Sequence, residues 1–127
     1  MAASPTSRTL DALRAQGMRA EVVERWNPHS RTRHDLFSFI DIVAIDQQQG
    51  AIVGIQATAA AVQARRRKII EECSEAAHAW LNAGGRIEVW GWRRLKVKRG
   101  GKATRWTPRT IEITAADIDT KTPPGAA

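Results

Sequence analysis

The sequence is poor in cysteine and has no long apolar run, and each absence excludes a class of protein. Its one cysteine, Cys73, cannot form a disulfide within the chain, and no cysteines and histidines have zinc-site spacing. No apolar run approaches the roughly 20 residues that a membrane-spanning helix needs. The first ten residues, MAASPTSRTL, lack the apolar stretch of a secretory signal. We therefore expect an intracellular, cytoplasmic protein without a membrane partner.

The chain carries a surplus of positive charge. It has 20 lysines and arginines against 13 aspartates and glutamates, for a formal net charge of +7. A surplus of this size on a small domain favours a polyanionic partner, most often nucleic acid, over a merely soluble basic protein. A length of 127 residues suits one core, so we expect a single domain over residues 1–127.

The first third of the chain is predicted to contain a helix, a strand and a loop. Thr6 or Ser7 is a candidate N-cap for a helix over residues 8–16. Residues 18–26 are typical of a strand. Residues 27–34, NPHSRTRH, are typical of a polar basic loop because Asn-Pro breaks regular structure.

The middle of the chain is predicted to form two strands and a long helix. Residues 36–46 are a nearly continuous apolar run, which favours a strand covered on both faces. Residues 47–50 then form a polar turn, and residues 51–58 return as a second strand. From residue 59 to residue 83 the apolar side chains recur at helical spacing, which predicts one helix.

The last part of the chain is predicted to be rich in β-structure and basic. The elements expected there are a strand over residues 86–92, a basic hairpin with arms over 95–98 and 103–107, a strand over 109–114 and a polar tail over 117–127. The complete order predicts an α/β sandwich with a mixed central sheet flanked by helices. Its core covers about residues 8–92, and the hairpin and last strand cover about residues 93–114.

Polar residues interrupt both central strands. Asp41 lies in the run FIDIVAID, and Gln56 and Thr58 lie at the end of the next strand, in GIQAT. A carboxylate faced by such a pair is a candidate metal pocket, since Mg²⁺ prefers oxygen ligands. Ligands of one ion should lie within about 5 Å of each other. The competing interpretation is a buried Asp41 satisfied by main-chain donors beside a polar sheet face.

These elements and motifs resemble the PD-(D/E)xK nuclease superfamily, and most closely its small Holliday-junction-resolvase-like and phage-encoded members. The superfamily core is a restriction-endonuclease-like αβββαβ unit, with an Asp in the second strand and an (E/Q)-x-K triplet in the third. Here FIDIVAID supplies Asp41, and GIQAT supplies Gln56, Ala57 and Thr58. The resemblance covers roughly residues 8–92. It implies a DNA endonuclease that depends on Mg²⁺ or Mn²⁺, with branched DNA as the more specific substrate and a homodimer as the assembly.

The resemblance also implies a set of metal ligands. Asp41, the side-chain carbonyl of Gln56 and the main-chain carbonyl of Ala57 are the expected oxygen donors. A further acid normally comes from the N-terminal part of the fold. Glu24 is the first candidate, and the alternatives are Asp35, Glu21 and Asp11. The competing interpretation for these acids is an ordinary surface charge.

The chain departs from the family motif at Thr58, which stands in the position of the lysine. Threonine is neutral near pH 7 and cannot replace a lysine that activates water. In one interpretation a cation of the following helix, Lys68 or Arg65, reaches in and completes a catalytic set with Asp41, Gln56 and Thr58. In the other, activity is weak or lost and the protein is a DNA-binding accessory factor. A third interpretation is a basic interaction module whose polar strand residues are structural.

Three basic segments are candidates for contacts with the DNA backbone, which position DNA without reading its sequence. They lie in the predicted loop, helix and hairpin, and comprise Arg31, Arg33, Arg65, Arg66, Arg67, Lys68, Arg93, Arg94, Lys96, Lys98, Arg99 and Lys102. Trp26 and Trp106 lie beside these segments and are candidates for stacking on unpaired bases, although packing is the commoner role of tryptophan.

Overall fold

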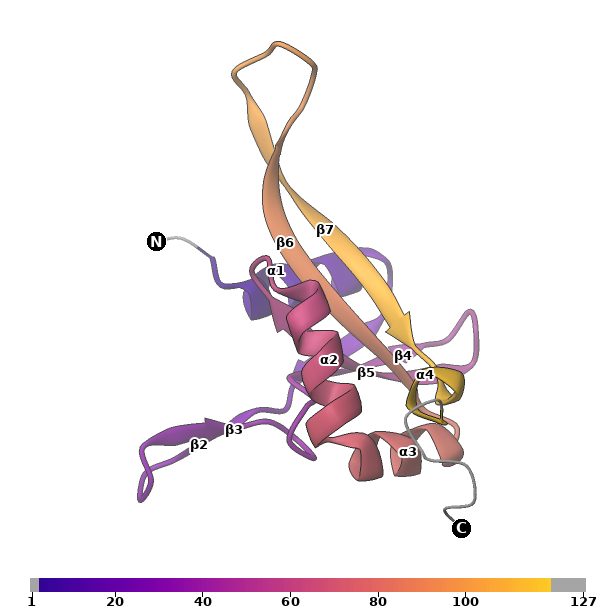
Figure 1. The fold of residues 1–127 in the computed structure, drawn as a ribbon. Coiled ribbons are helices and arrows are strands. Elements are labelled where there is room, and N and C mark those ends of the chain that lie inside the picture. Colours follow the sequence, from indigo (N-terminus) through magenta and orange to yellow (C-terminus); the bar gives the residue numbers. More distant parts are fainter. Residues whose placement is uncertain (1–2, 120–127) are drawn as a thin grey trace.

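A mixed five-stranded sheet runs through the centre of the molecule, with helices on both faces (Figure 1). The computed structural model describes residues 3–119. The strand order is β1-β4-β5-β6-β7, and the strands are β1 (Arg19–Val22), β4 (Ile42–Asp46), β5 (Ala51–Thr58), β6 (Arg86–Lys96) and β7 (Thr104–Ile113). The helices are α1 (Pro5–Ala15), α2 (Val62–Glu72), α3 (Ser74–Asn82) and α4 (Ala115–Asp119). The predicted α/β class with a mixed sheet flanked by helices is therefore confirmed.

Within residues 3–119, only one neighbouring pair of strands in the main sheet is parallel. β5 and β6 run in the same direction, whereas β1–β4, β4–β5 and β6–β7 are antiparallel. A parallel pair needs a long crossover connection, and α2 and α3 supply it between β5 and β6. Because the two strands are parallel, the C-terminal ends of β5 and β6 point in the same direction.

The two faces of the sheet bury separate apolar clusters. On one face, Leu13 of α1 packs with Ile42, Ile55 and Trp92. On the other face α2, α3 and α4 cover a cluster that includes Phe39, Ile69, Ala77, Val89 and Ile118. Alternate residues of one strand point to opposite faces, so Ile55 faces α1 whereas Gln56 and Thr58 face the helical crossover.

The first helix starts earlier than residue 8. Pro5 occupies its first turn, and the Ser4 hydroxyl accepts a hydrogen bond from the Ser7 amide at 3.1 Å. The cap is therefore Ser4, and the prediction of Thr6 or Ser7 is wrong. Proline suits this position because its missing N–H needs no partner in the first turn.

Residues 18–34 form three short strands. The predicted strand over residues 18–26 is divided into β1 and β2 (Arg25–Asn27), and the predicted loop contains β3 (Thr32–His34). β2 and β3 pair as a small antiparallel hairpin outside the main sheet. The Asn27 side chain accepts a hydrogen bond from the His29 amide at 2.9 Å and so holds the turn of the hairpin.

The apolar run over residues 36–46 is only half a strand. β4 begins at Ile42, and residues 35–40 form a tight turn closed by a bridge between Leu36 and Ile40. Phe37 and Ser38 have positive φ values of 54° and 72° in this turn. The run is apolar because the turn itself delivers Phe39 and Ile40 to the core, where both are fully buried. The turn and strand predicted over residues 47–58 are confirmed.

The predicted helix over residues 59–83 is broken at Cys73. This residue ends α2 and precedes α3, with φ −119°. Both helices still turn their apolar residues toward one cluster, which includes Ile69 and Ala77. The Trp80 indole N–H then donates to the main-chain carbonyl of Arg86 at 2.8 Å and fastens α3 to the start of β6.

The C-terminal strands are longer than predicted. The expected strand, hairpin arms and last strand merge into two continuous strands, β6 and β7, whose pairing extends from Ile87–Ile113 to Lys96–Thr104. Both strands project beyond the body of the molecule (Figure 1). Part of the predicted tail forms the short helix α4, and residues 120–127 lie outside the described residues. No helix among residues 3–119 is long and apolar enough to cross a bilayer.

Candidate metal centre

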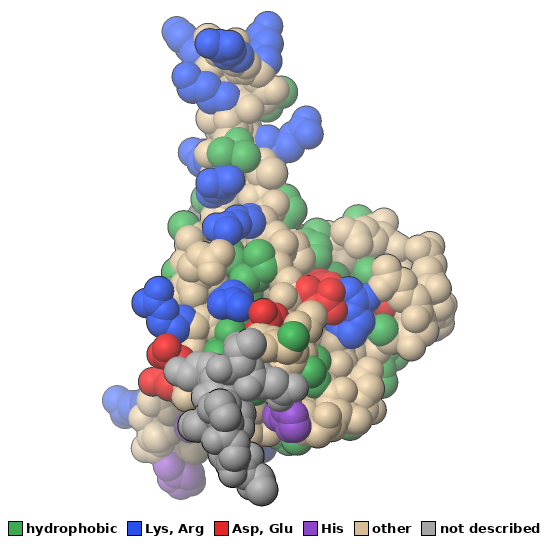
Figure 2. Space-filling view, turned by 45° about the vertical axis from the view of Figure 1, so that its right-hand side comes forward, with side chains coloured by type: hydrophobic (Ala, Val, Ile, Leu, Met, Phe, Trp, Pro, Cys, Tyr) green, Lys and Arg blue, Asp and Glu red, His purple; other side chains and the backbone are tan. Residues whose placement is uncertain are grey.

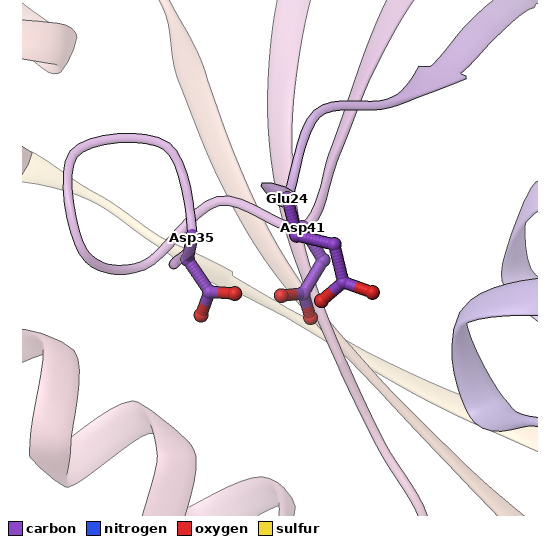
Figure 3. Close-up of side chains that lie close together, drawn as sticks. All are labelled: Glu24, Asp35 and Asp41. Atoms are coloured by element: carbon purple, nitrogen blue, oxygen red, sulfur yellow. The ribbon is translucent and has the colours of Figure 1, made fainter. Parts of the chain in front are cut away.

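Three carboxylates from different segments converge beside the start of β4. Glu24 lies between β1 and β2, Asp35 follows β3, and Asp41 directly precedes β4. Each contributes an oxygen to a group in which all the chosen atoms lie within 4.8 Å of one another. Figure 3 shows the carboxyl groups close together. We call Glu24, Asp35 and Asp41 the acidic cluster, and it is able to hold a metal ion.

Asp41 is the buried member of the acidic cluster, with 4% of its surface exposed. Its Oδ2 accepts two hydrogen bonds, from the Gln56 side-chain amide at 2.8 Å and from the Ala57 main-chain amide at 2.9 Å. Burial, a hydrogen bond to Asp35 and the charges of Asp35 and Glu24 raise the pKa of Asp41 to about 8, although the Ala57 amide opposes the shift. Asp41 therefore carries a proton at neutral pH until a cation takes its place.

The predicted proximity of Asp41 and Gln56 is confirmed, but the facing atom differs from the expected one. The amide nitrogen of Gln56, rather than its carbonyl oxygen, faces Asp41. The Ala57 carbonyl lies on the same side of β5 as its N–H, toward Asp41, because both groups of a strand residue point to one side. Thr58 is buried and lies on the same face of β5 as Gln56.

Of the four acids considered as the additional ligand, two join Asp41. Glu24 and Asp35 belong to the acidic cluster together. Asp11 is exposed on α1, and the exposed Glu21 lies 3.8 Å from Arg14 on the α1 side. Sequence reasoning treated Glu24 and Asp35 as alternatives, since the tight turn that carries Asp35 back to Asp41 leaves no signal in an apolar run.

The cation that touches the acidic cluster is Arg33. Its Nη1 lies 3.3 Å from Oε1 of Glu24, so a side chain predicted to bind DNA forms an ion pair with a candidate metal ligand. Lys68 is exposed on α2, on the side of Cys73. Burial raises the pKa of the Cys73 thiol and the Lys68 charge partly offsets this shift, which places the ammonium group near the α2–α3 junction.

The remaining predicted DNA contacts occupy different surroundings. Arg66 forms an ion pair with Asp117 of α4 at 3.0 Å, so it ties two helices together. Arg65 is half-buried, and the others are exposed, namely Arg31, Arg67, Arg93, Arg94, Lys96, Lys98, Arg99 and Lys102. Two guanidinium groups lie over the Trp106 ring, that of Arg8 at 4.0 Å and that of Arg94 at 5.4 Å from the ring centroid.

A hollow of about 490 Å³ opens beside the acidic cluster. Its lining includes Arg25, Trp26 and His34 of the small hairpin together with Asp35 and Phe37 of the tight turn. Trp26 and Phe37 expose more than half of their surface. A substrate that reaches Asp35 therefore meets cationic and aromatic side chains next to the carboxylates.

Comparison of the chain with protein-family models, with curated protein sequences and with solved structures finds no match.

Proposed function

We propose that this chain is a metal-dependent endonuclease that hydrolyses phosphodiester bonds of DNA. The observation that carries the proposal is the convergence of Glu24, Asp35 and Asp41 beside Gln56 and Ala57, near the end of β5. Three carboxylates around one point suit Mg²⁺ or Mn²⁺, which prefer hard oxygen ligands.

The order of the elements supports the same proposal. Without the small hairpin, the chain follows the sequence α1, β1, β4, β5, helical crossover and β6. This is the αβββαβ order that the resemblance to the PD-(D/E)xK superfamily implies. Asp41 immediately precedes the second strand of the main sheet, and Gln56, Ala57 and Thr58 end the third. In the superfamily the motif lies in the second and third strands, so a position next to β4 and at the end of β5 supports the resemblance.

The residues of the site have separate roles in this proposal. Asp41, Glu24, Asp35 and the Ala57 carbonyl would hold the ion. When bound, the ion polarises the phosphate and lowers the pKa of the attacking water. Asp41 would release its proton to solvent in order to hold the ion, and the Gln56 and Ala57 amides would keep its carboxylate in place. Arg33 would exchange its contact with Glu24 for one with the phosphate, since the guanidinium and the metal ion would compete for the same carboxylate.

A second candidate function is supported by Thr58. A nuclease-like protein that binds DNA without cutting it, as an accessory protein, needs no lysine in the third strand. Thr58 is neutral, and Gln56 replaces an acid that would strengthen metal binding. Lys68 and Arg65 are the helical cations that would have to supply the missing charge in an active enzyme.

The experiment that separates the two functions uses plasmid DNA and branched DNA with Mg²⁺ or Mn²⁺. We expect nicking by the wild-type protein, no nicking by Asp41→Asn, and unchanged DNA binding by that variant. Asp11→Asn is the matched control, because it removes an exposed carboxylate on α1. Binding without nicking under either metal would establish the second function instead. Light scattering of the same samples measures whether the chain forms the homodimer that the resemblance implies.

A further inference from the structure

The part of β6 and β7 that leaves the body of the molecule is strongly cationic. Residues 93–107, which we call the ribbon, contain no acidic residue. Lysine and arginine side chains gather over this projection in Figure 2. Its seven cations are Arg93, Arg94, Lys96, Lys98, Arg99, Lys102 and Arg105.

The ribbon is paired, and beyond the contact of Trp106 with Arg8 of α1 its side chains are largely exposed. Trp92 is buried, whereas the four residues from Arg93 to Lys96 are all exposed, so the ribbon leaves the core between Trp92 and Arg93. Pairing nevertheless continues to Lys96 and Thr104, and the Val97 amide donates to the Ala103 carbonyl at 3.0 Å. Leu95 and Val97 expose 39% and 54% of their surfaces. An ordered two-stranded ribbon with exposed apolar side chains is suited to a partner.

Charge selects the class of partner. A second copy of the chain would bring seven further cations against the same surface, which opposes association through the ribbon. Duplex DNA carries one negative charge per about 1.7 Å of its axis, and its major groove admits a two-stranded β-ribbon. Both the charge and the width of the ribbon therefore match duplex DNA.

The register of the sheet places the ribbon relative to the acidic cluster. Ala57, whose amide binds Asp41, pairs with Trp90, and β5 and β6 are parallel. The ribbon thus leaves the sheet at the same end of the strands at which the acidic cluster lies. Nine residues separate Trp90 from Arg99, which corresponds to about 30 Å along an extended strand. That length equals about nine base pairs of duplex, or almost one helical turn.

We propose that the ribbon lies in the major groove of duplex DNA, with its tip almost one helical turn away from the acidic cluster. The nuclease would thereby require a double-stranded arm on one side of the bond that it cuts. The proposal depends on the proposed function only for the position of this cut. Binding of the ribbon to the duplex is independent of cleavage and can be measured without metal.

The test compares duplexes of about 8 and about 24 base pairs in buffer with a metal chelator, since only the longer duplex spans the cluster and the tip of the ribbon. We expect the double variant Lys98→Gln/Arg99→Gln to bind the long duplex about tenfold more weakly and the short duplex less than about twofold more weakly. The slope of log K against log salt concentration should fall by the equivalent of about two phosphate contacts. Arg14→Gln/Arg19→Gln removes the same charge from α1 and β1 and should leave both affinities nearly unchanged. The double variant Lys98→Arg/Arg99→Lys keeps both positive charges and should bind as tightly as the wild-type protein.

A second measurement identifies the groove. Bulky substituents on C5 of pyrimidines fill the major groove, so they should weaken binding by the wild-type protein and have no further effect on Lys98→Gln/Arg99→Gln. Unchanged wild-type binding would overturn the groove assignment. Equal effects of the ribbon and control variants, or self-association that the ribbon variant abolishes, would overturn the proposal itself. Metal-independent binding through the ribbon without any cutting would support the ribbon proposal and refute the nuclease.

Discussion

The side-chain amide of Gln56 donates a hydrogen bond to Oδ2 of Asp41 over 2.8 Å and joins the end of β5 to the start of β4. The Ala57 amide donates to the same oxygen at 2.9 Å. A glutamate in the place of Gln56 would add a fourth carboxylate to a cluster in which burial, together with the neighbouring Asp35 and Glu24, already raises the pKa of Asp41 to about 8. A neutral amide thus allows three acids to converge without a bound cation.

The first prediction concerns stability and pH without metal. The pKa of Asp41 is raised from 3.8 to about 8, so between these values the folded chain retains a proton that the unfolded chain has lost. Asp41 therefore stabilises the fold most below about pH 4, and this contribution falls by up to about 1.4 kcal/mol per pH unit until about pH 8. Urea unfolding should show a steeper loss of stability for the wild-type protein than for Asp41→Asn. Parallel pH profiles would contradict the assignment.

The second prediction concerns metal binding. Mg²⁺ or Mn²⁺ should raise the unfolding temperature of the wild-type protein, because a ligand that binds only the folded state stabilises it. Binding should release close to one proton below about pH 8, when Asp41 is still protonated. Asp41→Asn should abolish both effects. Glu21→Gln removes an acid outside the acidic cluster, and a comparable loss in that control would show that the ions bind elsewhere.

The third prediction concerns the missing lysine. Thr58 lies on the same strand face as Gln56, so a longer cationic side chain there would be directed toward the acidic cluster. Thr58→Lys should increase cleavage by about tenfold or more and lower the pKa of Asp41. Thr58→Met provides a neutral side chain of similar length. Equal cleavage by the lysine and methionine variants would show that position 58 has no role in the chemistry.

The fourth prediction concerns Arg33. Removing its charge frees Glu24, so Arg33→Gln should strengthen Mg²⁺ binding a few-fold, in line with about 0.5–1 kcal/mol for an exposed ion pair. If Arg33 also contacts the phosphate, cleavage by this variant should fall although its metal affinity rises. Arg31→Gln removes a cation from the turn of the same hairpin. Isothermal titration and nicking assays would then distinguish a role at the cluster from general attraction of DNA.

The fifth prediction concerns the packing of α2 on β6. A Cβ atom added to Gly91 would overlap Cγ2 of the buried Val62. Gly91→Ala should therefore reduce the free energy of unfolding by about 1–3 kcal/mol, as expected for an overfilled core. Combination with Val62→Ala should recover part of this loss, because the smaller side chain makes room. Strictly additive effects in urea unfolding would place the strain elsewhere.

The elements with strong local signals could be predicted from the sequence. β5 was bounded correctly because an apolar, β-rich segment follows the turn at residues 47–50. The proximity of Asp41 and Gln56 also followed from pairing of neighbouring strands. In contrast, the helix break at Cys73 involves neither proline nor glycine, and the three-residue strands β2 and β3 are too short for a periodic pattern.

The membership of the acidic cluster could be predicted only in part. Asp35 reaches Asp41 because residues 35–40 form a turn with two positive φ values, in a run that reads as a strand. The ion pair between Arg33 and Glu24 depends on the pairing of β3 with β2, which follows Glu24 directly in the chain. Both features depend on which segments of the folded chain lie next to each other. The periodicity of a single sequence does not reveal such contacts.

The two edge strands of the sheet, β1 and β7, determine whether a further strand can pair with it. The Trp92 amide donates to the main-chain carbonyl of Ala59, on the side of β6 that faces away from β7. Pro108 is the β7 residue paired with Trp92, so the backbone groups of Pro108 point to the open side of β7. Proline has no N–H to offer there, and the opposite edge, β1, is only four residues long. Both edges therefore resist the addition of a foreign strand, which should protect concentrated protein against β-aggregation.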